Sequence, residues 1–176
     1  KLSRAVLEDV GKNGSVPVGQ QISEMIDKLT SRRTYDVVLI DSRAGLAELT
    51  APAITGLGAT VLLFGTAQTQ TIEGYRALFA ALRLLAQRDL AHGGKANWRL
   101  ALRPVYAKAS LNGAKAQQFL DDFFDLYSEY LYDAEQLEIT DCTTAPTNGL
   151  RFSRDDSDAP HWPLMIPFNP AFIDFD

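Results

Sequence analysis

Residues that could carry chemistry stand close together in one stretch, where an apolar run ends on an acidic residue. The run covers residues 37–40, Asp41 follows it, and Gly45 comes four positions later. A carboxylate at the end of a buried strand can hold Mg²⁺ through water, and a nearby glycine lets the backbone approach a γ-phosphate. The same aspartate could instead cap a helix or begin a turn. The stretch therefore predicts either half of a metal-nucleotide site or a local cap.

The glycine-rich phosphate loop that normally accompanies such a carboxylate is missing from this sequence. A phosphate loop needs glycines that present backbone N–H groups, and a lysine followed by Ser or Thr. Residues 93–96 (Gly-Gly-Lys-Ala) match only part of this pattern, because alanine follows the lysine and no glycine stands five positions before Gly94. Residues 113–115 fail similarly. We interpret residues 93–96 as a turn.

Apolar spacing predicts alternating helices and strands along the chain. Helices are expected over residues 21–33, 71–87 and 114–131, and strands over residues 37–40, 60–65, 98–106 and 164–166. Pro104 indicates an irregularity or an edge position in its strand. Residues 133–160 are expected to be mostly irregular connection. The alternation favours an α/β fold, a three-layer sandwich with a mainly parallel sheet.

Composition limits the remaining classes of protein. The 176 residues are 46% hydrophobic and can bury one core, so we expect a single α/β domain over residues 1–176. The only cysteine, Cys142, cannot form an internal disulfide, which favours a cytoplasmic location. A net charge of −5 gives no support for nucleic acid as a partner. No basic amphipathic helix follows Phe175, so membrane docking is likewise unsupported.

Residues 35–80 resemble the Walker B and switch II region of the deviant Walker A ATPases, the ParA/MinD-like branch (SIMIBI class) of the P-loop NTPases. The resemblance rests on Asp41-Ser-Arg-Ala-Gly45 with the apolar run before it, and on residues 58–66 with the polar turn after them. Residues 164–170 are similar to the strand and proline-containing loop that closes over the base in this family. The first segment is closest to large bacterial ATPases with a variant phosphate loop, mostly of unassigned function.

The resemblance implies roles for the residues around the metal and the phosphates. Asp41 would hold Mg²⁺ through water, and Gly45 would donate its backbone N–H to the γ-phosphate. These two residues are the expected catalytic pair, and Asp41 is the expected metal residue. Ser42, Arg43 and Thr66 would lie beside the nucleotide, although a solvated arginine is an alternative for Arg43.

The resemblance also implies a base-binding side. Lys108 would lie near the position where many relatives keep a base-contacting asparagine, and Pro167, Phe168 and Asn169 would line the adenine. Two departures stand out. A lysine replaces the asparagine at Lys108, and residues 133–160 form a longer connection than is usual in the relatives.

The implied cofactors are ATP and Mg²⁺, which would bind only if the missing phosphate loop is supplied. The relatives place that loop upstream of Asp41, so we expect the chain to be the C-terminal portion of a larger P-loop NTPase domain that lacks the phosphate-loop strand. The isolated chain is then expected not to hydrolyse ATP, since that loop makes most of the phosphate contacts. An unpaired strand position would favour a homodimer or a protein partner.

Other interpretations of the same residues remain open. The chain could be a degenerate P-loop fold that works as an interaction module without catalysis. The chain could also be a receiver-like domain with Asp41 as phosphate acceptor. Such domains keep an acidic pair at the end of their first strand, and this chain does not have that pair in the expected order. Aromatic residues at helical spacing over residues 119–130 predict core, or alternatively a groove for a partner. His92 and His161 have no metal-ligand spacing and are interpreted as loop histidines.

Overall fold

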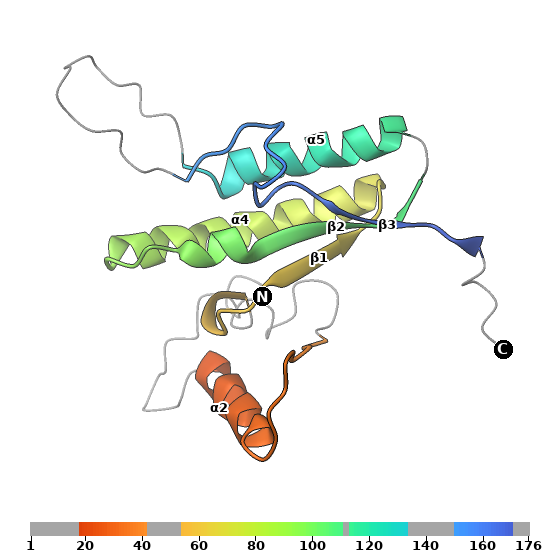
Figure 1. Ribbon diagram of the computed structural model, residues 1–176. Helices are drawn as coiled ribbons and strands as arrows, with labels where there is room; N and C mark the ends of the chain where they lie inside the picture. Colours follow the sequence, from red (N-terminus) through yellow and green to blue (C-terminus); the bar gives the residue numbers. More distant parts are fainter. Residues whose placement is uncertain (1–17, 42–53, 111–112, 134–149, 171–176) are drawn as a thin grey trace. The chain divides into compact units, whose positions relative to one another are not determined.

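The computed structural model describes residues 18–41, 54–110, 113–133 and 150–170, and these form an α/β protein with a small three-stranded parallel sheet (Figure 1). The strands are β1 (Val61–Gly65), β2 (Leu102–Ala109) and β3 (Leu164–Pro167), in the order β1-β2-β3. The helices are α2 (Val18–Thr30), α4 (Thr69–Ala91) and α5 (Gly113–Tyr130), and the 3-10 helix η1 (Asn97–Ala101) precedes β2.

By its internal contacts the chain divides into two units, which are described separately. The first contains Lys1–Val61 and Leu84–Leu102, and the second contains Leu62–Arg83 and Arg103–Asp176. The prediction of a single domain over residues 1–176 stays a prediction.

Aromatic side chains form the core of the second unit. Phe79 on α4 and Phe119, Phe123 and Tyr127 on α5 are fully buried. The ring of Phe79 meets that of Tyr127 edge-on at 5.1 Å, and Tyr106 of β2 stacks on Phe119 at 4.6 Å. Edge-on and offset aromatic pairs add to the free energy gained by burial. Phe119, Phe123 and Tyr127 of α5 are therefore core, as their spacing predicts, whereas Phe124 and Tyr130 are only partly buried.

The end of β1 lies close to the start of α4 because Gly65 has no side chain. A Cβ at Gly65 would lie 2.6 Å from Cγ2 of Thr71. The Tyr75 hydroxyl donates to the Phe64 carbonyl at 2.6 Å, and burial raises the pKa of Tyr75 to about 12. Helices α4 and α5 lie on the same side of the sheet (Figure 1).

The structure confirms most of the expected elements. Helices α2, α4 and α5 and strands β1 and β3 fall within a few residues of their predicted bounds. The sequence predicts a strand over residues 98–106. The first part of this range is the 3-10 helix η1, and the strand starts only at Leu102. In the predicted connection over residues 133–160, the described residues 150–160 contain no helix or strand, as predicted. Residues 134–149 of that connection lie outside the described residues.

One predicted strand is absent, and one of the two alternatives for Pro104 fails. Residues 37–40 form no strand, and Val37 and Leu39 are 70% and 89% exposed. A strand needs a neighbouring backbone to pair with, and the sheet of the described residues contains only β1, β2 and β3. Pro104 does not mark an edge, because β2 is the central strand of the described sheet. The other alternative, an irregularity, agrees with the 3-10 helix η1 that replaces the first part of the predicted strand.

Candidate functional site

Five of the predicted site residues lie where the three parallel strands end. Thr66 follows β1, Lys108 is the penultimate residue of β2, and Pro167 is the last residue of β3. The backbone N–H of Phe168 donates to the Ala109 carbonyl at 3.1 Å, which joins the chain after β3 to the end of β2. The carboxyl edge of a parallel sheet is the usual place for a ligand in α/β proteins. We call Thr66, Lys108 and residues 167–169 the rim.

Lys108 has an unusual backbone conformation. Its φ angle is 54°, in the left-handed region that disfavours residues with a Cβ. Pairing of β2 with β3 shifts between Ala107 and Ala109, so Lys108 is the extra residue of a β-bulge. Such a backbone costs on the order of 1 kcal/mol and is most common at functional sites. The side chain of Lys108 is exposed at the rim.

Thr66 begins a polar turn that leads into α4. Its hydroxyl lies 3.4 Å from the Thr71 hydroxyl, and its carbonyl accepts the N–H of Gln68 at 2.7 Å. The N–H of Thr71 in turn donates to the Gln68 carbonyl at 2.9 Å. Both hydroxyls are only partly buried. A threonine hydroxyl can donate and accept, so this turn offers polar contacts to a ligand at the rim.

Of the residues expected to contact the metal and the phosphates, the structure describes only some. Asp41 is exposed, outside any helix or strand, and belongs to the first unit. Ser42, Arg43 and Gly45 lie outside the described residues. Within the described ranges, no group of three or more His, Cys, Asp or Glu is arranged to hold a metal. Asp41 therefore belongs to no cluster of metal-ligating side chains among the described residues.

Residues 93–96 form the turn that the sequence predicts. Gly93 has φ 82°, and the N–H of Gly94 donates to the Asp89 carbonyl at 2.9 Å. A Cβ at Gly94 would lie only 1.9 Å from Oδ1 of Asp89. The other oxygen of that carboxylate accepts the N–H of Ala96 at 2.8 Å. The glycines are therefore needed to end α4 beside Asp89, and the interpretation as a turn is confirmed.

His161 is the residue whose environment sequence reasoning missed. It is fully buried, although its neighbours form no helix or strand. The Tyr132 hydroxyl lies 2.7 Å from its Nδ1, and the Arg154 carbonyl lies 3.1 Å from its Nε2. Burial lowers the pKa of His161 below its usual 6.5. Its partner Tyr132 is 29 positions away, so spacing along the chain could not reveal the contact.

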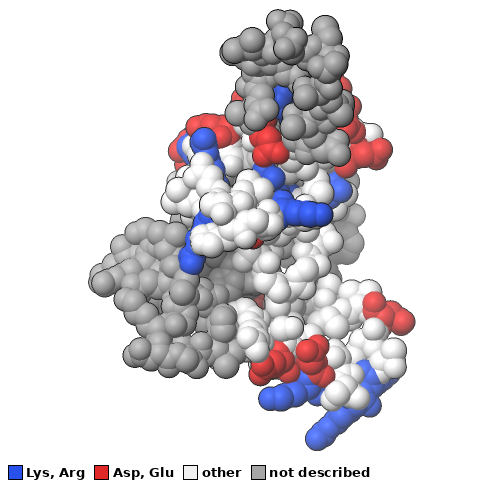
Figure 2. All heavy atoms as spheres, turned by 90° about the vertical axis from the view of Figure 1, so that its left-hand side faces the viewer, with Lys and Arg blue, Asp and Glu red and all other residues white. Residues whose placement is uncertain are grey.

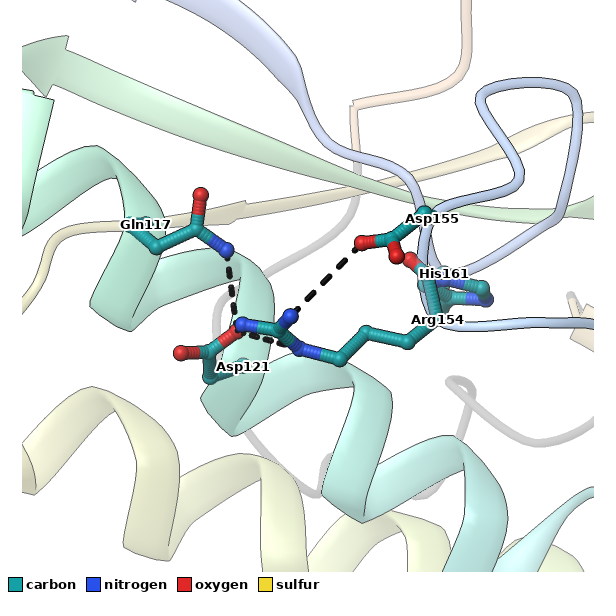
Figure 3. Close-up of polar contacts among 5 residues, drawn as sticks. All are labelled: Gln117, Asp121, Arg154, Asp155 and His161. Carbon is teal, nitrogen blue, oxygen red and sulfur yellow. Dashed lines mark hydrogen bonds and ion pairs between the residues drawn. The ribbon is translucent and has the colours of Figure 1, made fainter.

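Arg154 joins the segment around His161 to α5 (Figure 3). Its Nε donates to Oδ1 of Asp121 at 2.9 Å, and its Nη2 contacts the same oxygen. Nε2 of Gln117 donates to that oxygen at 3.1 Å. The side chains of Arg154 and Asp121 are 43% and 40% exposed, so water screens their attraction. Such a pair contributes at most about 1 kcal/mol to stability.

Charged side chains of both signs occur together on the described surface. On the face in Figure 2, Lys and Arg side chains stand beside Asp and Glu side chains. None of the described helices has the length and apolar character needed to cross a membrane. Comparison with protein-family models, with curated proteins and with solved structures gives no match to this chain.

Proposed function

We propose that this chain is the downstream portion of a ParA/MinD-like nucleotide-switch ATPase, and that the rim receives the base side of ATP. The observation that supports this most is the meeting of the ends of β1, β2 and β3, with Lys108 held in a left-handed bulge at the central strand. A three-layer sandwich of the P-loop NTPase kind is part of the proposal. The described parallel sheet is compatible with it.

Residues of the rim fit an adenine ring in their chemistry. Phe168 is 47% exposed and offers an aromatic surface for stacking. Lys108 can donate to a ring nitrogen but cannot accept from the amino group of adenine, because an ammonium has no acceptor. The carboxamide of Asn169 has both functions. We assign stacking to Phe168 and edge contacts to Lys108 and Asn169.

The metal and phosphate contacts are assigned to the segment after residue 40. Asp41 would hold Mg²⁺ through water, the N–H of Gly45 would contact the γ-phosphate, and Ser42 and Arg43 would lie beside it. Bound Mg²⁺ would neutralise charge on the phosphates. The sequence contains no phosphate loop. The proposal therefore predicts no ATP turnover by this chain alone.

A nucleotide titration followed by ¹H–¹⁵N NMR tests the proposal on the isolated chain. We expect ATP and ADP to shift the amide signals of the rim, and phosphate release to stay at background. Lys108→Ala should weaken binding by about tenfold, the usual effect of losing one charge-assisted hydrogen bond. Lys95→Ala is the matched control, because Lys95 is also exposed and lies in the turn after α4.

Two outcomes of this titration count against the proposal. Rim signals that stay unchanged at millimolar ATP, in a spectrum that shows a folded chain, would exclude a base site at the rim. Turnover by the isolated chain would contradict the need for a separate phosphate loop. Reading the codons that precede Lys1 gives an independent check, because the proposal predicts a glycine-rich loop with a lysine there.

A second candidate function, a non-catalytic interaction module, is favoured by apolar side chains exposed on the edge strands. Leu62 and Phe64 of β1 are 46% and 55% exposed, and Leu164 and Ile166 of β3 are 53% and 48% exposed. Exposed apolar surface of this kind commonly marks a protein contact. Sedimentation velocity over a hundredfold range of concentration tests for a homodimer. A Phe64→Ser variant should dissociate such a dimer, and a monomer at every concentration would oppose this candidate.

A further inference from the structure

A segment without helix or strand, residues 150–163, connects to the end of α5 and leads into β3. We call it the strap. Its beginning pairs with Asp133, whose N–H donates to the Leu150 carbonyl at 3.0 Å and whose carboxylate accepts the Leu150 N–H at 2.6 Å. Near its end, Nη1 of Arg103 on β2 donates to the Ala159 carbonyl at 2.8 Å. The strap is thus fixed at both ends.

His161, two residues after Ala159, makes two hydrogen bonds, and a neutral ring satisfies both. The Arg154 carbonyl can only accept, so Nε2 of His161 must carry the proton. Nδ1 is then an acceptor, and the Tyr132 hydroxyl donates to it. One bond stays within the strap, and the other ties the strap to the residue just beyond α5. A second ring proton at Nδ1 would make the Tyr132 hydroxyl turn from donor to acceptor, so its own proton would lose its partner at Nδ1.

The surroundings of His161 also oppose a positive charge. The imidazole is fully buried, with the rings of Phe124, Tyr127 and Tyr132 at centroid distances of 5.0, 6.3 and 5.9 Å. Burial raises the pKa of Tyr127 well above its usual value, so its phenol stays neutral and offers no anion to a charged ring. The pKa of Tyr132 is raised in the same way, again mainly because of burial. The apolar shell therefore favours the neutral imidazole.

Charged groups on the neighbouring elements do not reverse this preference for the neutral form of His161. From β2, Arg103 adds a positive charge that acts on the neighbouring tyrosines. The Asp121 carboxylate of α5 and the Asp155 carboxylate of the strap pair with the Arg154 guanidinium. Asp156 favours a charged His161, but less strongly than burial opposes it. One oxygen of Asp156 is also engaged with the N–H of Asp158 at 3.0 Å.

The strap determines how β3 is held. His161 stands three residues before Leu164, where β3 begins to pair with Val105 of β2. All four side chains of β3 are exposed, so little burial of its own fixes this strand. We infer that neutral His161 latches the strap against α5, and that protonation of its ring releases the strap together with β3. Pro167 and the rim residues after it would be released too, and this link to ligand binding rests on the proposed function.

Hydrogen exchange of the full chain at two pH values, without nucleotide, tests the latch. The chain has two histidines. Between about pH 7.5 and about pH 5.5, the protection factors of the non-proline amides in residues 162–168 should fall several-fold, by at most about tenfold per pH unit, the limit for uptake of one proton. His161→Gln should remove this pH dependence. His92→Gln should keep it, because His92 is exposed and bonds the Arg88 carbonyl at the end of α4.

Two further measurements protect the test against a variant that does not fold. In the wild-type chain, ring ¹⁵N shifts should show His161 as the Nε2–H tautomer at about pH 7.5 and should titrate below the usual histidine value. Tyr132→Phe keeps the imidazole but removes its donor, and should lower protection of the non-proline amides in residues 162–168 already at about pH 7.5. A His161 ring that titrates normally, or protection of these amides that is the same at both pH values, would overturn the latch. Failure of nucleotide binding would leave the latch standing.

Discussion

Two residues other than glycine have a positive φ among those that the structure describes, Ala96 and Lys108, and they are held there for different reasons. Ala96 is buried, its N–H donates to the Asp89 carboxylate, and its carbonyl accepts Nε of Arg99 at 3.2 Å. Those contacts explain its conformation. Lys108 is exposed and sits in a bulge whose neighbours, Ala107 and Ala109, both pair with β3.

The left-handed backbone of Ala96 is explained by its hydrogen bonds and burial, whereas no such contacts among the described residues explain that of Lys108. At Ala96 the surrounding bonds fix the backbone, and a turn after α4 is the result. At Lys108 a glycine would occupy the same φ at lower cost, yet the chain has a long cationic side chain there. Strain that persists beside an open rim is typical of a binding site. This contrast is the physical basis for assigning ligand contact to Lys108.

The largest effect on stability is expected when the hydrogen bond from the Ala96 N–H to the Asp89 carboxylate is broken. Gly94→Ala would place a Cβ 1.9 Å from Oδ1 of Asp89, so the carboxylate must move and give up its bond to the Ala96 N–H. We expect a loss of roughly 1–3 kcal/mol in the free energy of unfolding, measured by urea denaturation. Gly74→Ala on α4 is the control, because a Cβ at Gly74 would meet no other atom within 4 Å. It should stabilise the chain by about 0.5–1 kcal/mol, and equal effects of the two substitutions would refute the role given to Asp89.

A smaller effect of opposite sign is expected at the bulge. Lys108→Gly relieves the left-handed strain of an exposed residue and should raise the free energy of unfolding by about 0.5–1 kcal/mol. Ala96→Gly relieves a similar strain but removes a buried methyl group, so we expect a change within about 0.5 kcal/mol. Destabilisation by Lys108→Gly would show that its side chain stabilises the fold, and the contrast between the two positions would then fail.

Local patterns predicted what depends on local contacts. The apolar spacing of α5 identified both the helix and its buried face, and the glycines after α4 identified a turn. Three features depend on partners far along the chain. The bulge at Lys108 requires pairing with β3, burial of His161 requires Tyr132, and a strand over residues 37–40 requires a neighbouring strand that the described sheet does not provide. Side-chain type alone cannot specify such partners.

For the candidate site, the family resemblance implied that Thr66, Lys108 and Pro167 lie around one ligand, but not how the chain runs there. Thr66, Lys108 and Pro167 lie at the same edge because parallel strands must end on one side. The left-handed backbone of Lys108 could not be foreseen, since lysine has no preference for it. Roles that the family resemblance implies for Asp41 and Gly45 remain proposals.

The most direct test of the account measures stability and nucleotide binding on the same Lys108→Gly variant. We predict a chain that unfolds at higher urea concentration than the wild type, yet binds ATP about tenfold more weakly in the NMR titration, because strain and a charge-assisted contact are lost together. Ala96→Gly should leave ATP binding unchanged. A Lys108→Gly chain that binds ATP as well as the wild type, while Phe168 and Asn169 still respond to the nucleotide, would contradict the role of Lys108 at the rim.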